Sequence, residues 1–211
     1  MRRDDYPYTR PIIGEDNTAT PAYLKAFKDF IALSPGFHDD PEMLKEFYAG
    51  SDRASVILLG SFVENILVAV LKSKMRPDLS NTLEGRLVEG NGPISTFSAK
   101  IHIAFAFELF GPVFLHDLNL IRELRNAFAH VQHPMTLSTP QIAEVCKHLK
   151  LADDRKLSIS PMSYFEHSPD QTVAKDKTHP RTRFTVTCHT ISISLLQVQS
   201  AILNRAAYTL P

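Results

Sequence analysis

The sequence predicts an all-α protein, a single-domain antiparallel helical bundle of about six to seven helices. Three observations indicate this class. Apolar residues recur at the i, i+3 and i+4 spacing of amphipathic helices along most of the chain. Several such segments begin at Asp-Pro or Thr-Pro pairs, which suit the N-cap and first position of a helix. Gly-Pro and Pro-Gly pairs separate the segments by short connections, which favour antiparallel neighbours.

The 211 residues, 44% of them apolar, are enough for one domain with a sizeable core. Residues 1–20 are polar and contain two prolines, so they are expected to form a flexible N-terminal arm. The helical bundle core is expected to span residues 21–150. Two helices open it, Pro21–Leu33 and a short helix from Pro41 to Phe47.

Residues 52–74 are predicted to form a long helix that is apolar on most sides and therefore central in the bundle. Glu64 interrupts one of these apolar sides. An acid at such a position is not expected to be buried without a partner, and Arg125 or Arg122 is the natural one. The pair has two readings: a structural ion pair, or a contact that orients the arginine for function.

A polar connector follows over residues 76–91, with a short helical turn expected around Leu83 and Leu87. Ser95-Thr96 then provides an N-cap for the next helix. Gly111-Pro112 ends that helix and leads to the following one. The apolar face of the helix is formed by Phe97, Ile101, Ala104, Phe105 and Leu109.

Asp117–His130 is predicted to be the helix around which the chain is organised. Its apolar stripe consists of Leu118, Ile121, Leu124 and Phe128. His116-Asp117 is expected to open the helix, because an acid is favourable near a helix N-terminus. Pro134 cannot continue a helix, so His130 is expected in the last turn.

The end of this helix combines a cation, an amide and a titratable imidazole in Arg125, Asn126 and His130. At about 100° per residue, Arg122, Asn126 and His130 form one row, whereas Arg125 lies about 140° from His130. A straight helix therefore cannot bring Arg125 and His130 onto one small ligand. Either the last turn unwinds, or a second copy supplies the missing group. We favour a two-fold homodimer, which brings the same patch of both subunits face to face.

The C-terminal third is less regular. Thr139-Pro140 begins a short amphipathic helix, and residues 151–180 are polar and proline-rich, as expected of a loop or mobile lid. Residues 181–211 are ambiguous, because their Thr, Ile and Val content favours a strand while their apolar spacing also suits a helix. Since no partner strand is predicted elsewhere, we predict a C-terminal helix that packs on the core.

The chain has 23 basic and 23 acidic residues. This balance argues against an extended positively charged surface that binds nucleic acid, but it is compatible with a small local basic patch. No stretch reaches the roughly 18 apolar residues of a membrane span, and no apolar run follows the N-terminus. We therefore expect no membrane contact and a cytoplasmic location. Cys146 and Cys188 lack disulfide or metal spacing and are expected to be buried thiols.

No cofactor is expected, because the sequence has no phosphate loop, dinucleotide fingerprint or nucleophile elbow. His130 and His133 have a spacing that suits metal ligation. No cysteine or carboxylate nearby in the sequence completes a ligand set, so we expect no metal site.

Two stretches resemble a known family. They are Pro93–Ile101, which reads Pro-Ile-Ser-Thr-Phe-Ser-Ala-Lys-Ile, and His116–His130. Over about residues 50 to 150 and the last helix, the chain resembles the bacterial mannitol operon repressor (MltR) family. The second stretch is also similar to the wider HEPN superfamily, whose signature is an arginine followed a few residues later by a histidine, often with an asparagine after the arginine.

The resemblance implies a HEPN/MltR-like helical bundle that dimerises through the motif helix. Active HEPN members are metal-independent ribonucleases in which the histidine and arginine act on the scissile phosphate. The MltR family is named for transcriptional repression, yet this sequence shows no helix-turn-helix.

Two functions follow. The first is a dimeric regulatory protein, a transcriptional repressor of a carbohydrate (mannitol-type) operon, which acts through a regulatory protein partner or weak contact with RNA or DNA. The alternative is an endoribonuclease in which His130 acts as acid or base and Arg125 stabilises the phosphorane. Asn126 orients the histidine or donates to a phosphate oxygen, and Arg122 adds a second cation. Glu64 and Asp117 are candidate binding or orienting residues. A purely structural role, with ion-paired arginine and a capped helix end, fits the same pattern.

Overall fold

The structure is a computed structural model that describes residues 50–153 and 176–209 of the chain. The chain divides into two units, residues 1–39 and 40–211, and all described residues belong to the second. The predicted N-terminal arm, the two predicted helices before residue 50 and most of the predicted 151–180 loop lie outside the described residues. Six α-helices and one 3₁₀ helix account for the regular structure of the described ranges, which contain no strand. The all-α prediction is therefore confirmed for this part of the chain.

Three of the helices begin at a residue whose side chain caps them. The side chains of Ser51, Ser80 and Thr96 each accept a hydrogen bond from a backbone N–H in the first turn of the helix that follows. The short helix expected near Leu83 is present. The elements are α3 (Asp52–Lys74), α4 (Asn81–Val88), α5 (Phe97–Ala106), α6 (Pro112–His130), α7 (Pro140–Lys147), the 3₁₀ helix η1 (Leu151–Asp153) and α10 (Pro180–Thr209).

Helix α3 is central, as predicted, because it packs against α5, α6 and α10. Its apolar residues bury against the stripe of α6 and the first half of α10. These interlocking faces form the core, which includes Val56, Leu67, Ile101, Leu118, Ile121, Phe128, Phe184 and Ile191, all fully buried. The ambiguous C-terminal segment is a helix, also as predicted.

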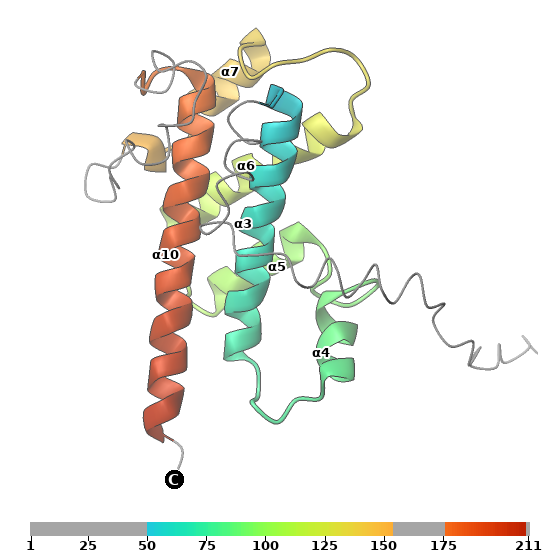
Figure 1. The fold of residues 1–211 in the computed structure, drawn as a ribbon, viewed down its shortest axis with the longest axis vertical. Helices are drawn as coiled ribbons and strands as arrows, with labels where there is room; N and C mark the ends of the chain where they lie inside the picture. Colours follow the sequence, from blue (N-terminus) through green and yellow to red (C-terminus); the bar gives the residue numbers. More distant parts are fainter. Residues whose placement is uncertain (1–49, 154–175, 210–211) are drawn as a thin grey trace, which may run out of the picture. The chain divides into compact units, whose positions relative to one another are not determined.

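The two longest helices run in the same direction, which corrects the prediction of an antiparallel bundle for this pair. Figure 1 shows α3 and α10 side by side. Arg181 at the start of α10 contacts Asp52 at the start of α3 at 2.8 Å, and Gln199 further along α10 donates to the carbonyl of Ala69 at 3.4 Å. Only short connections favour antiparallel neighbours. Helix α6 already ends beside the start of α3, where Arg53 donates to the carbonyls of Val131 and His133, so α10 starts at that same end and runs parallel to α3.

Helix α6 begins at Pro112, five residues earlier than predicted, with Gly111 as N-cap and proline at the first position. Asp117 therefore does not open the helix. It is fully buried in the second turn, where its carboxylate accepts the backbone N–H groups of Lys150 at 3.0 Å and Leu151 at 2.8 Å. The consecutive apolar residues after Pro112 hid the helical period in the sequence.

The first residues of the predicted 151–180 loop belong to the folded core. Leu151 and Ala152 of η1 are buried. Arg183, only 7% exposed, donates to the carbonyls of Cys146 at 3.0 Å and Leu149 at 2.6 Å, and pairs with Asp153 at 2.7 Å. This contact lowers the pKa of the Asp153 carboxyl. Arg183 thus satisfies carbonyls that the end of α7 leaves without helical partners.

Cys146 and Cys188 are buried free thiols, as predicted. Burial raises the pKa of Cys146 to about 12 and raises that of Cys188 as well. Both sulfurs are therefore protonated near neutral pH and serve as apolar packing groups.

Two helices of the described part are long and apolar enough to cross a membrane by length and composition, α3 and the Pro180–Asn204 part of α10. The expectation that no stretch of the chain meets this criterion was therefore wrong. Half of the most apolar stretch of α3 is buried within the structure. The central helix of a water-soluble core meets the same criterion, so it does not by itself place the chain in a membrane.

Candidate anion-binding site

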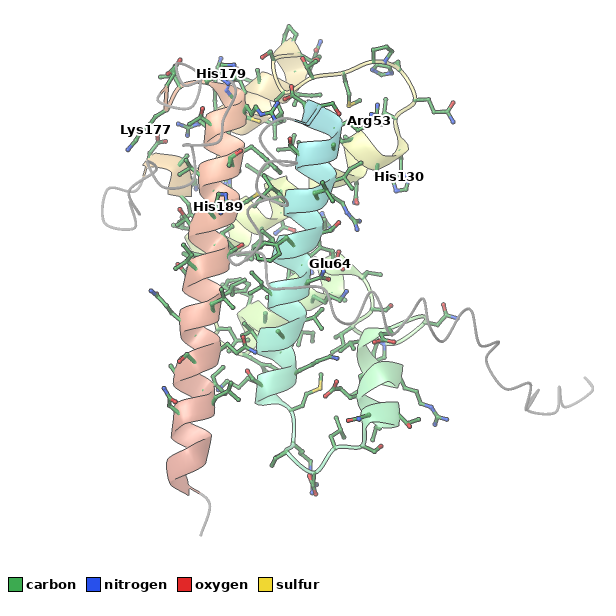
Figure 2. All side chains as sticks on the ribbon, in the orientation of Figure 1. Arg53, Glu64, His130, Lys177, His179 and His189 are labelled. Atoms are coloured by element: carbon green, nitrogen blue, oxygen red, sulfur yellow. The ribbon has the colours of Figure 1, made fainter. Side chains whose placement is uncertain are left out.

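A polar pocket of about 390 Å³ lies between the middle of α3, the start of α5 and the second half of α6. It brings together four of the residues that the sequence singled out, Glu64, Arg122, Arg125 and Asn126. Glu64 projects from the middle of α3 (Figure 2). The remaining lining residues come from the start of α5 and are Ser95, Thr96, Phe97 and Ser98.

Glu64 binds two cations. Arg125 Nη2 lies 3.4 Å from Glu64 Oε2, in agreement with the expected pairing. The shorter contact, 2.6 Å to Oε1, comes from the ammonium of Lys100, which sequence reasoning missed. Lys100 lies on the apolar face of α5 between Phe97 and Ala104. A base on the buried face of one helix and an acid on the buried face of another was the signal that could have revealed this pair.

The pocket carries excess positive charge. The side chains of Lys100 and Glu64 are 8% and 14% exposed, so their close contact neutralises both charges at the base of the pocket. Arg125, 30% exposed, keeps only the longer contact to Glu64 and a 3.3 Å hydrogen bond to Asn126 Oδ1. Arg122 pairs with Glu123, whose side chain faces solvent, while the buried Nε of Arg122 has no partner. The guanidinium of Arg125 is thus left with charge to offer an anion.

The start of α5 adds further donors to the same pocket. Thr96 caps the helix, and its hydroxyl oxygen accepts the N–H of Ala99 at 3.1 Å. The N–H groups of the first helical residues, Phe97 and Ser98, have no acceptor within the helix. These groups and the positive end of the helix dipole favour an anion at this position.

Gly60 allows α6 to approach α3 closely enough for Arg125 to reach Glu64. A Cβ atom at Gly60 would lie 3.0 Å from both Cβ and Cγ of Arg125. Gly60 and Glu64 lie one turn apart on the same side of α3. The backbone of α6 therefore passes close to Gly60, and the side chain of Arg125 extends from it toward the carboxylate of Glu64.

Substituting Gly60 with alanine is expected to lower the free energy of unfolding by about 1–2 kcal/mol, because the Cβ atom of Arg125 is fixed to the backbone of α6 and cannot rotate away. Urea unfolding followed by circular dichroism measures the loss. Gly85→Ala in α4 is the matched control, since its Cβ would meet only Glu89 Oε2, at 3.8 Å. Alanine there is expected to stabilise by about 0.5 kcal/mol. Equal effects of the two substitutions would contradict the close packing at Gly60.

His130 does not line the pocket. It is the last residue of α6, as predicted, and it is exposed. Helix α6 remains regular through His130, so the structure does not support unwinding of its last turn. The carbonyls at this end are capped by Arg53, which donates to Phe128, to Val131 at 2.9 Å and to His133 at 3.3 Å. Figure 2 shows Arg53 and His130 at this same end of the helix.

Asp117 also lies outside the pocket. Its contacts to the backbone after α7 and a 2.9 Å contact with His116 Nδ1 use both of its carboxylate oxygens. Its role in the structure is to hold the turn that leads into η1. Within the described ranges, no group of three or more His, Cys, Asp or Glu side chains is arranged to hold a metal ion.

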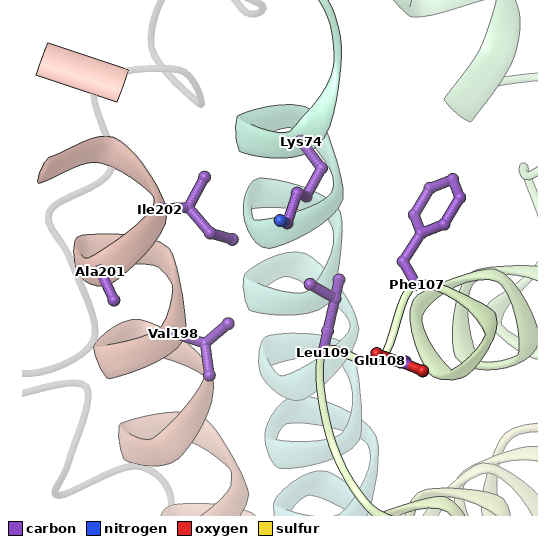
Figure 3. A pocket seen from close by; sticks show the side chains of 7 residues that line it. All are labelled: Lys74, Phe107, Glu108, Leu109, Val198, Ala201 and Ile202. Atoms are coloured by element: carbon purple, nitrogen blue, oxygen red, sulfur yellow. The ribbon is translucent and has the colours of Figure 1, made fainter. Parts of the chain in front are cut away.

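A second pocket, of about 400 Å³, is mainly apolar. Figure 3 shows Val198 and Ile202 of α10 facing Lys74 and Leu109 across it. Lys74 and Glu108 are the two charged residues of its lining. The polar pocket next to α6 is therefore the stronger candidate for a functional site.

The described part of the chain is thus an all-α protein with a positively charged pocket at a helix–helix junction. No protein-family model, curated protein or solved structure matches this chain. The interpretation of the pocket therefore depends on the residues themselves.

Proposed function

We propose that this chain is a regulatory protein with an MltR-like and HEPN-like helical bundle, which acts as a cytoplasmic homodimer. Its role is repression of a carbohydrate (mannitol-type) operon through a protein partner or weak nucleic-acid contact. The observation that carries the proposal is the pocket, which Arg122, Arg125 and Asn126 line together with Glu64, whose carboxylate is paired with Lys100. Such a pocket suits binding of an anionic group, while His130, the group suited to proton transfer, lies elsewhere.

The balance of 23 basic and 23 acidic residues supports a local contact over an extended one. A protein that binds DNA tightly without a partner protein needs many uncompensated positive charges and a helix or strand that contacts the base edges. Regulation through a partner or through one weak contact requires only the pocket.

The first test is the oligomeric state and DNA binding of the full-length chain. Light scattering with size-exclusion chromatography is expected to show a dimer. Fluorescence anisotropy is expected to show weak DNA binding without sequence preference, reduced in Arg125→Gln and unchanged in Arg86→Gln, an exposed arginine of α4. A strict monomer would overturn the dimer proposal, and tight sequence-selective binding would overturn action through a partner.

The second candidate is a metal-independent endoribonuclease. The observation that favours it is that Arg125 is held by Glu64 and Asn126, as an arginine that stabilises a phosphorane would be. In a dimer, the partner subunit's His130 would supply the acid or base. It would take the proton of a ribose 2′-OH, which attacks the adjacent phosphorus, and the departing 5′-oxygen would receive a proton.

RNA cleavage in the presence of a chelator distinguishes the two functions. A nuclease is expected to lose its activity in His130→Ala and keep it in His148→Ala, since both histidines are exposed at or next to helix ends. Cleavage that persists in His130→Ala would exclude this mechanism. No cleavage by a pure dimer on structured or unstructured RNA would leave the regulatory proposal.

A further inference from the structure

We infer that the pocket between α3, α5 and α6 binds the phosphate group of a small phosphomonoester. The inference rests on the proposed regulatory function, because it names the class of ligand to which the regulatory protein would respond. It starts from three features of the pocket: its size, the sides from which its donors come and its charge.

The donors approach from two helices. Arg122, Arg125 and Asn126 line one side from α6, while Ser95, Thr96, Phe97 and Ser98 line the other at the start of α5. A phosphate group has several oxygens in a tetrahedral arrangement and accepts hydrogen bonds from opposite sides at once. A planar carboxylate has two oxygens and would leave part of this donor set unused. The volume of about 390 Å³ suits a phosphate with one small substituent.

The charge favours a dianion. The Lys100–Glu64 contact removes one positive and one negative charge. This leaves the guanidinium of Arg125, the guanidinium of Arg122 with its solvent-facing partner Glu123, and the positive end of α5 to face the ligand. A phosphomonoester carries close to two negative charges near neutral pH. A phosphodiester carries one negative charge and a second substituent, so it matches the pocket less well.

Lys100 has the role of a positioning residue. It does not line the pocket, and its ammonium is directed to Glu64. Without it, the whole charge of Glu64 would act on Arg125, whose guanidinium would then be neutralised inside the protein. Lys100 therefore keeps Arg125 available for the ligand without contacting the ligand.

The test uses the full-length protein and three probes, methyl phosphate, dimethyl phosphate and acetate, with binding measured by isothermal titration calorimetry. Methyl phosphate is expected to bind at least about tenfold more tightly than either other probe, which corresponds to a difference of about 1.4 kcal/mol in binding free energy. Arg125→Gln and Arg122→Gln are each expected to lose at least about tenfold in affinity for methyl phosphate, and Arg86→Gln none. Equal affinity for all three probes, or no binding, would overturn the inference.

A second set of variants tests the charge arrangement. Lys100→Met is expected to weaken methyl phosphate binding, and adding Glu64→Gln to it is expected to restore the binding, because the double variant removes the carboxylate as well. No restoration in a folded double variant would overturn the role of Lys100. Circular dichroism identifies variants that fail to fold, and the preference among probes in the unaltered protein does not depend on any variant.

The outcomes also separate this inference from the proposed function. If methyl phosphate does not bind, but the chain is a dimer whose DNA contact depends on Arg125, the inference fails and the proposed function stands. If methyl phosphate binds a strict monomer that makes no contact with DNA, the dimeric regulatory proposal fails while the phosphate site remains.

Discussion

Replacing Lys100 with methionine is expected to lower the free energy of unfolding by about 3 kcal/mol, because it leaves a largely buried carboxylate without its closest partner. Glu64 would keep only Arg125, at 3.4 Å, in place of two cations. The loss is placed at the low end of values for broken buried pairs because Arg125 remains. Urea unfolding followed by circular dichroism measures it.

Two further variants make this prediction specific. The double variant with Glu64→Gln and Lys100→Met replaces the ion pair by neutral groups of similar size and is expected to lie within about 1 kcal/mol of the unaltered protein. Lys147→Met removes the exposed pair with Glu144, whose 2.8 Å distance is similar, and is expected to change stability little. If Lys100→Met lowers the free energy of unfolding no more than Lys147→Met does, burial does not govern the strength of the Lys100–Glu64 contact.

Replacing Asp117 with alanine is expected to cost about 3 kcal/mol, since it leaves the buried N–H of Leu151 and the partly buried N–H of Lys150 without their acceptor. Asp117→Asn keeps one acceptor oxygen and is expected to lose less. The same unfolding experiment measures both. His116→Gln is the control, because His116 is partly exposed and contacts the same carboxylate. An alanine variant as stable as the control would show that the carboxylate does not hold the turn after α7.

The helices themselves were largely predictable, because their signals are local. The bounds of α3 agree with the prediction, since Ser51 caps its start and buried apolar residues recur at helical spacing as far as Leu71, within one turn of its end. Thr96 likewise caps α5, and Pro140 begins α7. The start of α6 was missed because Pro112 is followed by three consecutive apolar residues, which obscure the helical period.

The candidate site was predictable only in part. Arg122, Arg125 and Asn126 were identified from their spacing on one helix, and Glu64 from its place on an apolar side of another. Periodicity cannot show which residue of a third helix faces them, so Lys100 was missed. Asp117 was placed at a helix start, whereas the fold buries it under a turn more than thirty residues later in the sequence.

Local patterns in the chain therefore specified its helical class, most helix ends and the arginine cluster on α6, because capping and apolar spacing act over a few residues. Tertiary packing decided that α10 runs in the same direction as α3, that Lys100 neutralises Glu64 and that Asp117 holds the turn after α7. Each of these depends on how helices far apart in sequence approach one another. That approach is set by side-chain shape at the contacts, such as the absence of a side chain at Gly60.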